Sequence, residues 1–130
     1  MTNQCVIFMA NRAYALSNSR LFIIKHFISR GWRVILATCE DEESRKICGL
    51  GAELEPVSFR RGGLSVRLDY LAYRRIFEVL QKWKPALIHS FHAKPVILGS
   101  LAVKKLTANK PLVVNTITGL GYAFSSGGIQ

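Results

Sequence analysis

Residues 86–95, ALIHSFHAKP, mark a junction at which a buried strand passes into a helix. The apolar run 86–88 leads into His89, a short polar turn follows, and Pro95 suits the first turn of a helix. Two histidines and Lys94 therefore lie near a helix N-terminus, at the carboxyl end of a strand. Because open α/β sheets bind their ligands at this end of the strands, the junction indicates which side of the sheet carries the functional site.

The rest of the chain alternates between short apolar runs and segments with helical spacing. The spacing predicts strands over 4–10, 33–39, 53–59, 86–89 and 112–115, and helices over 20–30, 40–50, 67–84 and 95–106. Loops are expected over 11–19 and 60–65, and 118–130 has no helical pattern. This order implies an α/β fold, a Rossmann-like, doubly wound parallel sheet of about five strands with helices on both faces. Pro56 places the third strand at or near an edge of the sheet.

The connections after the first and fourth strands are expected to meet. Right-handed crossovers and the usual doubly wound strand order place these two strands side by side at the switch point of the sheet. Loops 11–19 and 90–94 would then flank a ligand crevice. No internal repeat or linker divides the 130 residues, which fit a single domain.

The chain is strongly basic, since 18 Lys and Arg against 8 Asp and Glu give a formal charge of +10. This balance suits a phosphate-bearing ligand, a nucleic acid or an acidic membrane surface, or it serves solubility alone. The N-terminus lacks the pattern of a signal peptide, and no apolar run approaches the roughly 20 residues that span a bilayer. A soluble or membrane-surface protein is therefore expected.

Several common catalytic and cofactor motifs are missing. No glycine-rich dinucleotide loop follows the first strand, and the chain has no P-loop, no nucleophile elbow and no motif of paired carboxylates. Cys5, Cys39 and Cys48 lack the spacing of metal ligands and are interpreted as reduced, buried, small hydrophobic residues. No metal site is expected, and residue chemistry alone names no reaction.

Five side chains are candidates for binding an anion or moving a proton. His89 is either a satisfied core histidine or a functional one, and His92 either faces solvent or suits proton transfer and phosphate contact. Lys94 is either an ordinary surface lysine or an anion ligand aided by the adjoining helix dipole. Arg60 and Arg61 precede two glycines, which suits phosphate binding but is equally typical of a solvated charge run.

The predicted helix 67–84 carries an aromatic stripe beside its core-facing one. Tyr70, Tyr73 and Phe77 form this stripe. It is bordered by Arg74, Gln81 and Lys84. Such a stripe can meet a partner domain or a membrane interface, or it can form the aromatic rim of the core.

Three segments that follow predicted strands carry a resemblance to a known family. They are 57–63 (VSFRRGG), 89–105 (HSFHAKPVILGSLAVKK) and 115–124 (NTITGLGYAF). Together they resemble the N-terminal domain of family-four glycosyltransferases, in particular those that build lipopolysaccharide, capsule or O-antigen sugars on a polyprenyl-diphosphate carrier. Lys94 and Pro95 match the pattern of that subset, whereas a histidine at position 92 departs from it.

The resemblance implies a GT-B architecture, in which two Rossmann-like domains enclose the active site. Residues 1–130 would form the N-terminal, acceptor-side domain, and the C-terminal donor-binding domain is absent from this chain. The implied function is transfer of a hexosyl or N-acetylhexosaminyl group from a nucleotide-sugar to a lipid-linked polyprenyl-diphosphate glycan, without a metal or another cofactor. The isolated chain is then expected to be inactive. The alternative is a non-catalytic, membrane-recruiting scaffold subunit that docks a separate donor-binding chain.

The resemblance also implies roles for the candidate residues. Those that would bind the acceptor phosphate are Asn11, Arg12, Arg60, Arg61 and Lys94. The candidate catalytic residue, His92, rests on the chemistry of its imidazole and not on the resemblance. Those that would line the cleft are His89, Thr118, Gly119, Leu120 and Gly121. The basic surface and the aromatic stripe would rest against anionic lipid, so a cytoplasmic protein at the inner face of the cytoplasmic membrane is expected. No nucleic-acid partner is expected, because only the net charge favours one.

Overall fold

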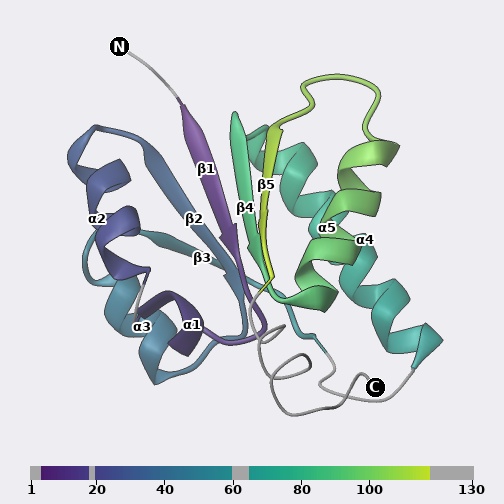
Figure 1. The fold of residues 1–130 in the computed structure, drawn as a ribbon, viewed down its shortest axis with the longest axis horizontal. Coiled ribbons are helices and arrows are strands. Elements are labelled where there is room, and N and C mark those ends of the chain that lie inside the picture. Colours follow the sequence, from purple (N-terminus) through teal and green to yellow (C-terminus); the bar gives the residue numbers. More distant parts are fainter. Residues whose placement is uncertain (1–3, 18–19, 60–64, 118–130) are drawn as a thin grey trace, which may run out of the picture.

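Strands and helices alternate along the chain, as the sequence predicts (Figure 1). The computed structural model describes residues 4–17, 20–59 and 65–117 of the 130. Its strands are β1 (Cys5–Met9), β2 (Arg33–Thr38), β3 (Glu53–Pro56), β4 (Leu87–Phe91) and β5 (Leu112–Thr116). Its helices are α1 (Tyr14–Ser17), α2 (Leu21–Ser29), α3 (Glu42–Cys48), α4 (Val66–Trp83) and α5 (Ala93–Lys105).

The strands pair in parallel into one sheet with the order β3-β2-β1-β4-β5. In the centre, Val6 of β1 is in register with Val34 of β2 on one side and with Leu87 of β4 on the other. The predicted parallel sheet and the neighbouring positions of β1 and β4 are confirmed. β3 is an edge strand, in agreement with its proline.

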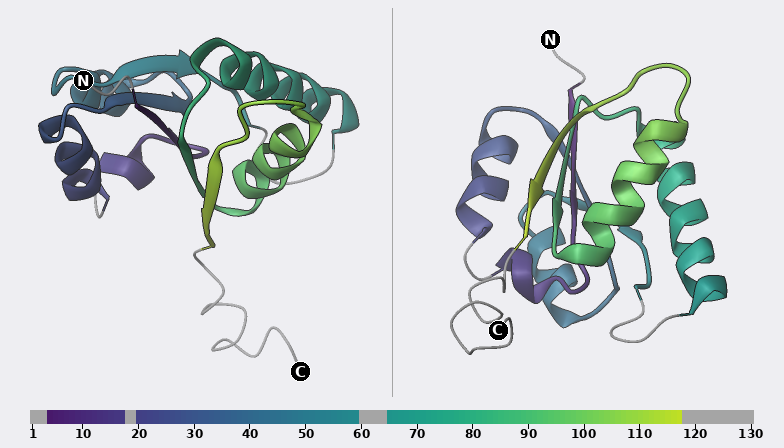
Figure 2. Two further views of the ribbon diagram at one scale, coloured as in Figure 1. Left: turned by 90° about the horizontal axis from the view of Figure 1, so that it is seen from above. Right: turned by 45° about the vertical axis from the view of Figure 1, so that its right-hand side comes forward.

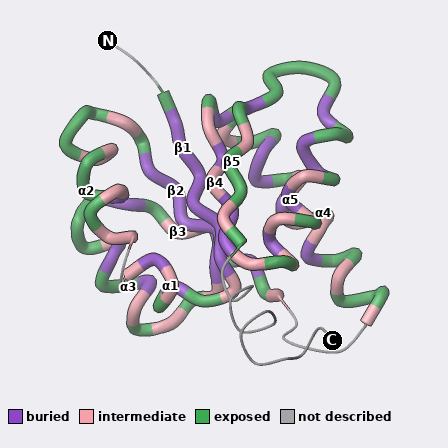
Figure 3. The backbone as a smooth tube through the Cα atoms, in the orientation of Figure 1, coloured by how far each residue is buried: buried purple, intermediate pink, exposed green. Residues whose placement is uncertain are grey.

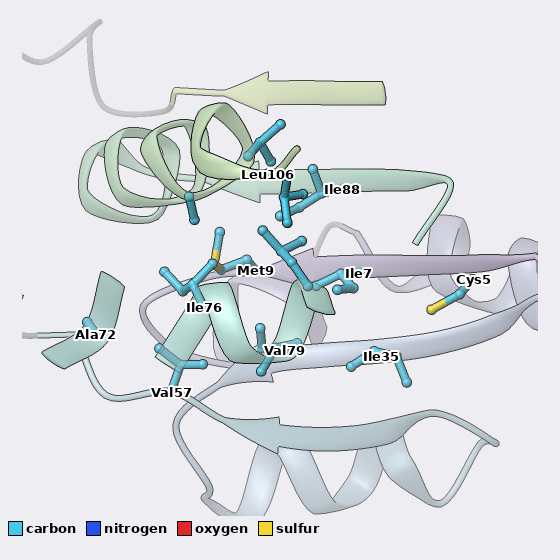
Figure 4. Packing of buried hydrophobic residues seen from close by; sticks show 14 residues of the cluster. Cys5, Ile7, Met9, Ile35, Val57, Ala72, Ile76, Val79, Ile88 and Leu106 are labelled. Carbon is cyan, nitrogen blue, oxygen red and sulfur yellow. The ribbon is translucent and has the colours of Figure 1, made fainter. Parts of the chain in front are cut away.

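Helices cover both faces of the sheet, and alternate residues of a strand pack against the two layers. Ile7 and Met9 of β1 pack with Ile88 of β4 against α4 and α5 (Figure 4). Val6 and Phe8 pack on the opposite face, against α1, α2 and α3. Burying one such side chain contributes roughly 1.5–3 kcal/mol to folding, so the two layers together hold the sheet at its centre.

The central and edge strands differ sharply in burial (Figure 3). All five residues of β1 are buried, because helices cover both of its faces and strands flank both of its edges. β5 forms the other edge of the sheet, and Leu112 and Val114 on one of its faces are 69% and 39% exposed. The chain after β1 therefore leaves a strand that is buried over its whole length.

α4 and α5 lie side by side on one face of the sheet (Figure 2). The absence of a side chain at Gly99 allows α5 to approach the sheet closely. A Cβ atom there would lie 2.5 Å from Met9 Cε and 3.2 Å from Ser90 Oγ. α5 thus packs directly on β1 and β4, the two strands that meet at the switch point.

The start of α3 follows from local hydrogen bonding. The Asp41 carboxylate accepts a hydrogen bond from Ser44 N (2.8 Å), and Ser44 Oγ accepts one from Asp41 N (2.9 Å). This reciprocal capping box satisfies N–H groups that have no acceptor within the helix. It fixes the start of α3 at Glu42, within the helix predicted over 40–50.

Two helix boundaries differ from the prediction near the functional edge of the sheet. α1 occupies part of the predicted loop 11–19, because Ala13 and Leu16 are buried against Phe8. A helix of one turn is too short to show helical periodicity in the sequence. α5 begins at Ala93, before the predicted start, and takes Pro95 into its first turn, where a missing N–H costs nothing.

A buried carboxylate fastens the edge strand β3 to α4. Glu55, whose side chain is 8% exposed, accepts hydrogen bonds from Arg75 Nη2 (2.7 Å), Lys82 Nζ (2.7 Å) and Trp83 Nε1 (2.6 Å). Burial alone would raise the pKa of Glu55, but the hydrogen bonds from Lys82, Trp83 and Arg75 outweigh it and lower the pKa below its ordinary value. The carboxylate is therefore ionised and fully paired at neutral pH.

Replacing Glu55 with glutamine is expected to lower the free energy of unfolding at pH 7 by about 2 kcal/mol, since three donors lose an anionic acceptor. A lowered pKa in the folded state stabilises the protein above the pKa of the unfolded chain, and this stabilisation is lost as the pH falls through the folded value. The difference between wild type and E55Q should therefore shrink below about pH 4. Urea unfolding followed by tryptophan fluorescence measures both quantities.

Glu78→Gln is the matched control on the same helix. Glu78 is 59% exposed and lies 3.9 Å from Arg75, so its loss should change the free energy of unfolding by less than about 0.5 kcal/mol. Equal losses in the two variants, or a loss in E55Q that does not depend on pH, would contradict the assignment of a buried ionic network.

Candidate functional site

A crevice opens where β1 and β4 end side by side. Met9 and Ser90 are in register at this edge. The chain then turns to α1 on one face after β1, and to α5 on the other face after β4. The crevice has a volume of about 380 Å³ and is lined by Asn11, Arg12, Tyr14, Ala15 and His92. It therefore occupies the switch point of the sheet, where open α/β sheets bind ligands.

Asn11 and Arg12 form the β1 side of the crevice. Asn11 Oδ1 is buried and has no hydrogen-bond partner within the part of the chain that the structure describes. A buried acceptor without a donor is costly, so Asn11 is poised to accept a hydrogen bond from a hydroxyl or amine of a ligand. Arg12 is exposed, and its backbone carbonyl accepts from Ala15 N (3.2 Å), which turns the chain into α1. The guanidinium offers up to five N–H donors to an anion.

His92 forms the β4 side of the crevice and is the N-cap of α5. Its φ of 74° lies in the left-handed region, which non-glycine residues seldom adopt. Its backbone N–H donates to the Thr116 carbonyl (3.0 Å), and its own carbonyl accepts from Val96 N (3.1 Å). Backbone strain of this kind persists where surrounding contacts enforce it, and it concentrates at ligand sites.

The N-terminus of α5 gives this side of the crevice a positive potential. The first N–H groups of a helix have no intrahelical acceptor, and the aligned peptide dipoles place partial positive charge there. Helix N-termini therefore bind phosphate and carboxylate groups. With Arg12 opposite, the crevice is suited to an anion.

Lys94 is the second residue of α5, but its side chain is committed elsewhere. Lys94 Nζ lies 2.8 Å from Asp69 Oδ1 of α4, and the side chains are 23% and 24% exposed. In the described residues, Lys94 is not among those that line the crevice. The structure thus brings Asn11, Arg12 and His92 together and places Lys94 beside the start of α4.

His89 lies within the sheet, where it has two well-defined neighbours. Its Nε2 atom lies 2.8 Å from Thr116 Oγ1 of β5, and its ring stacks on Phe91 at a centroid distance of 4.2 Å. Burial, aided by the positive charge of Arg20, lowers the pKa of His89 below its ordinary value. His89 is therefore neutral at pH 7 and joins β4 to β5. Its cleft-lining role stays a prediction.

Several predicted site residues lie outside the described ranges. These are Arg60, Arg61, Thr118, Gly119, Leu120 and Gly121. Their roles stay predictions. Conversely, sequence reasoning missed Tyr14, which is 63% exposed at the start of α1 and lines the crevice. The signal that could have found it is an aromatic residue five positions after the end of β1, a strand that ends at the functional edge.

A second cavity, the α4/α5 groove, runs between those two helices and has a volume of about 670 Å³. Its lining is mostly apolar, with lysines at one end: Val66, Asp69, Tyr70, Tyr73, Leu98, Leu101, Lys104 and Lys105. The predicted aromatic stripe divides here, since Tyr70 is 56% exposed whereas Tyr73 and Phe77 pack partly against the core. The stripe therefore contributes both to an exposed surface and to the rim of the core.

The described residues contain neither a cluster of metal-binding side chains nor a helix that could span a membrane. Across 4–17, 20–59 and 65–117, no three His, Cys, Asp or Glu side chains are close enough to bind one ion. Over the same ranges, no helix has the length and apolar character needed to cross a bilayer. Burial raises the pKa of the Cys5 thiol to about 11, so this cysteine is unreactive at neutral pH.

The solved structures that match this fold include glycosyltransferases. CalG4, the calicheamicin glycosyltransferase, matches with a TM-score of 0.67 and 16% identity over 100% of this chain and 38% of its own. MurG of Acinetobacter baumannii has the same TM-score and identity, over 88% of this chain and 34% of its own. A glycosyltransferase of Rickettsia africae gives 0.66 and 13%, over 88% and 30%. The chain thus spans about a third of the length of these proteins, between 30% and 38%.

The structural likeness establishes an α/β Rossmann-like domain of the kind found in GT-B glycosyltransferases. The sequence itself was also compared with curated proteins, and none matches. A family profile, in contrast, matches residues 5–128, which is nearly the whole chain, and its description is "Glycosyl transferase 4-like". The chain belongs to the glycosyl transferase 4-like family.

Proposed function

We propose that the chain is the acceptor-side domain of a transferase that moves a sugar from a nucleotide-sugar to a lipid-linked, polyprenyl-diphosphate glycan in bacterial surface polysaccharide synthesis. The observation that carries the proposal is the crevice at the switch point, where Arg12 faces the N-terminus of α5. A hexosyl or N-acetylhexosaminyl donor would be bound mainly by a second domain. The chain spans only 30–38% of the length of the similar structures. We therefore propose the second domain together with the function.

The crevice has the chemistry that a diphosphate requires. A guanidinium and a helix N-terminus are the two protein groups that bind phosphate oxygens most directionally. Asn11 Oδ1 adds a buried acceptor without a partner in the described residues, suited to a sugar hydroxyl. Fixed positive groups of this kind offset the charge of a diphosphate without a metal ion. His92, at the same crevice, is the candidate for proton transfer or phosphate contact.

The remaining predicted phosphate ligands would extend this surface. Arg60 and Arg61 precede α4 in the sequence, and Lys94 lies in the first turn of α5. The segment 118–121 follows β5 in the sequence, and its cleft-lining role is part of the same proposal.

The α4/α5 groove suits the lipid part of such an acceptor and the membrane that contains it. Its apolar lining includes Tyr70 and Leu101, which are 56% and 51% exposed. Lys104 and Lys105 add positive charge at one end, and the whole chain carries +10. An apolar surface bordered by lysines binds anionic membrane surfaces. We therefore place the protein at the inner face of the cytoplasmic membrane.

The alternative proposal is a non-catalytic subunit that recruits a separate donor-binding chain to the membrane. The α4/α5 groove would bind the membrane in this case too, and a chain that spans 38% of the length of CalG4 is also compatible with a separate subunit. The two proposals differ in whether one polypeptide transfers sugar, which the last experiment of this subsection decides.

Arg12→Ala is expected to weaken binding of inorganic pyrophosphate to the chain about tenfold, the value of one charge-assisted hydrogen bond. Isothermal titration measures the affinity, and amide chemical shifts of His92 and Ala93 report whether the anion occupies the crevice. Arg30→Ala is the matched control, because Arg30 is exposed at the far end of α2 and carries the same charge. Equal weakening in both variants would mean that net charge alone attracts the anion.

Reversing the charges of Lys104 and Lys105 to glutamate should weaken sedimentation with anionic phospholipid vesicles at least tenfold, since each basic residue near the surface contributes about 1 kcal/mol. The control with the same total charge is K25E/R30E on α2, which lies on the opposite face of the sheet. We expect the control to retain most of its binding at matched ionic strength. If both variants lose binding equally, the groove is not the membrane-facing surface.

Sugar transfer is tested with a polypeptide that joins these residues to a donor-binding domain. It should transfer sugar from nucleotide-sugars to a polyprenyl-diphosphate-linked acceptor, and Arg12→Ala should raise KM for the acceptor about tenfold while leaving KM for the donor nearly unchanged. The 130-residue chain alone should give no turnover. Turnover by the chain alone would overturn the two-domain proposal, and absence of transfer by the longer polypeptide would favour the scaffold subunit.

A further inference from the structure

The end of β5 holds one wall of the crevice in place. The carbonyl of Thr116 accepts a hydrogen bond from His92 N (3.0 Å), and His92 lines the crevice in a left-handed backbone conformation with a φ of 74°. A residue other than glycine keeps this conformation only where its surroundings enforce it. The position of the Thr116 carbonyl is therefore one of the constraints that determine the shape of the crevice.

β5 is a weakly held strand for such a task. It lies at an edge of the sheet, and within the part of the chain that the structure describes it pairs with β4 alone. Its residues are exposed or only half-buried, whereas those of β1 are all buried (Figure 3). Segments with few buried contacts open locally more readily than the centre of a sheet. The backbone ladder to β4 would therefore leave the last residue of β5 loosely fixed.

The side chain of Thr116 supplies a second attachment to β4. Its Oγ1 atom lies 2.8 Å from Nε2 of His89, and the hydrogen bond forms with either tautomer of the imidazole because a hydroxyl can both donate and accept. The core in turn holds His89, whose ring centroid lies 4.2 Å from that of Phe91 and 5.9 Å from that of Phe8. Both phenylalanines are fully buried. A continuous series of contacts thus runs from the core through His89 and Thr116 to His92.

Folding stability alone gives little reason for a polar pair between β4 and β5. Two apolar side chains of the same shape can replace a hydrogen-bonded pair at almost no cost in stability. A hydrogen bond adds direction, because it tolerates only a narrow range of distances and angles. The pair formed by His89 and Thr116 therefore fixes where the end of β5 lies relative to β4, which packing alone would fix less closely.

We propose that His89 and Thr116 are positioning residues. Their side-chain hydrogen bond fixes the end of β5, and the Thr116 carbonyl then holds His92 in the conformation that shapes the crevice for its anion. Both residues act through the backbone of His92 and need no contact with the ligand. The inference rests on the proposed function, because anion binding in the crevice is the property that the two residues are inferred to support.

Thr116→Val tests the proposal, because it removes the hydroxyl and keeps the branched shape and the backbone carbonyl. It should weaken binding of pyrophosphate, measured by isothermal titration, about fivefold. Thr116→Ser retains the hydroxyl and should bind within twofold of wild type. The matched control is Thr107→Val, the same substitution at an exposed position just after α5, and it should also stay within twofold. Binding by T116S as weak as that by T116V would overturn the proposal.

Amide hydrogen exchange separates positioning from a general loss of stability. The His92 amide donates to the Thr116 carbonyl, so a loosened end of β5 exposes it to exchange. In T116V this amide should accelerate at least tenfold more than the amides of β1. Equal acceleration at His92 and throughout β1 would mean that the hydroxyl only stabilises the fold, and it would overturn the proposal.

The double variant H89F/T116V provides a second separation of the two effects. T116V leaves the imidazole of His89 without its partner and should lower the midpoint of thermal unfolding, whereas the double variant leaves no polar group unpaired and should regain most of that loss. Under the proposal it regains stability but binds pyrophosphate as weakly as T116V. Recovery of wild-type affinity by the double variant would overturn the proposal. If R12A weakens binding and T116V does not, only this inference fails. If neither variant weakens binding, the proposed function fails with it.

Discussion

The complete burial of β1 is the constraint on which the rest of the structure depends. A parallel strand flanked by strands on both edges must be covered on both faces, and the chain meets this requirement with α1, α2 and α3 on one face and α4 and α5 on the other. The crossovers after β1 and β4 must then diverge, which leaves a crevice between their first residues. The position of the candidate site is thus a consequence of covering one strand, and its chemistry comes from the residues that happen to follow that strand and its neighbour.

The parallel sheet, its edge strand and the position of the crevice were predictable, because the sequence patterns that specify them are local and recur along the chain. Apolar runs alternating with helical spacing specify a parallel sheet, and a proline marks the edge strand. α1 escaped prediction because a single turn held by the burial of Leu16 has no periodicity to detect. Tyr14 was missed for the same reason, since it begins that turn. The sequence predicts Pro95 as the first residue of a helix. α5 instead begins at Ala93, because any position of the first turn tolerates a proline.

The partners of charged side chains were harder to foresee, because they join residues far apart in the sequence. Lys94 was expected to face an anion. Nothing near it in the sequence indicates that its Nζ atom lies 2.8 Å from Oδ1 of Asp69, which comes 25 positions earlier. Glu55 has the same character, since its three donors come from a helix that begins eleven residues later. Such pairs depend on how two elements pack, which residue patterns along one element do not encode.

α4 is anchored close to both of its ends. Near its C-terminus, Arg75, Lys82 and Trp83 hold the carboxylate of the edge strand, and near its N-terminus Asp69 holds α5. A helix fixed at two separated points cannot slide or rotate by itself, because either movement would break charged contacts that are shielded from water. The wall that α4 gives to the groove is therefore tied both to the edge strand and to α5, so a shift of α4 would have to move these two elements with it.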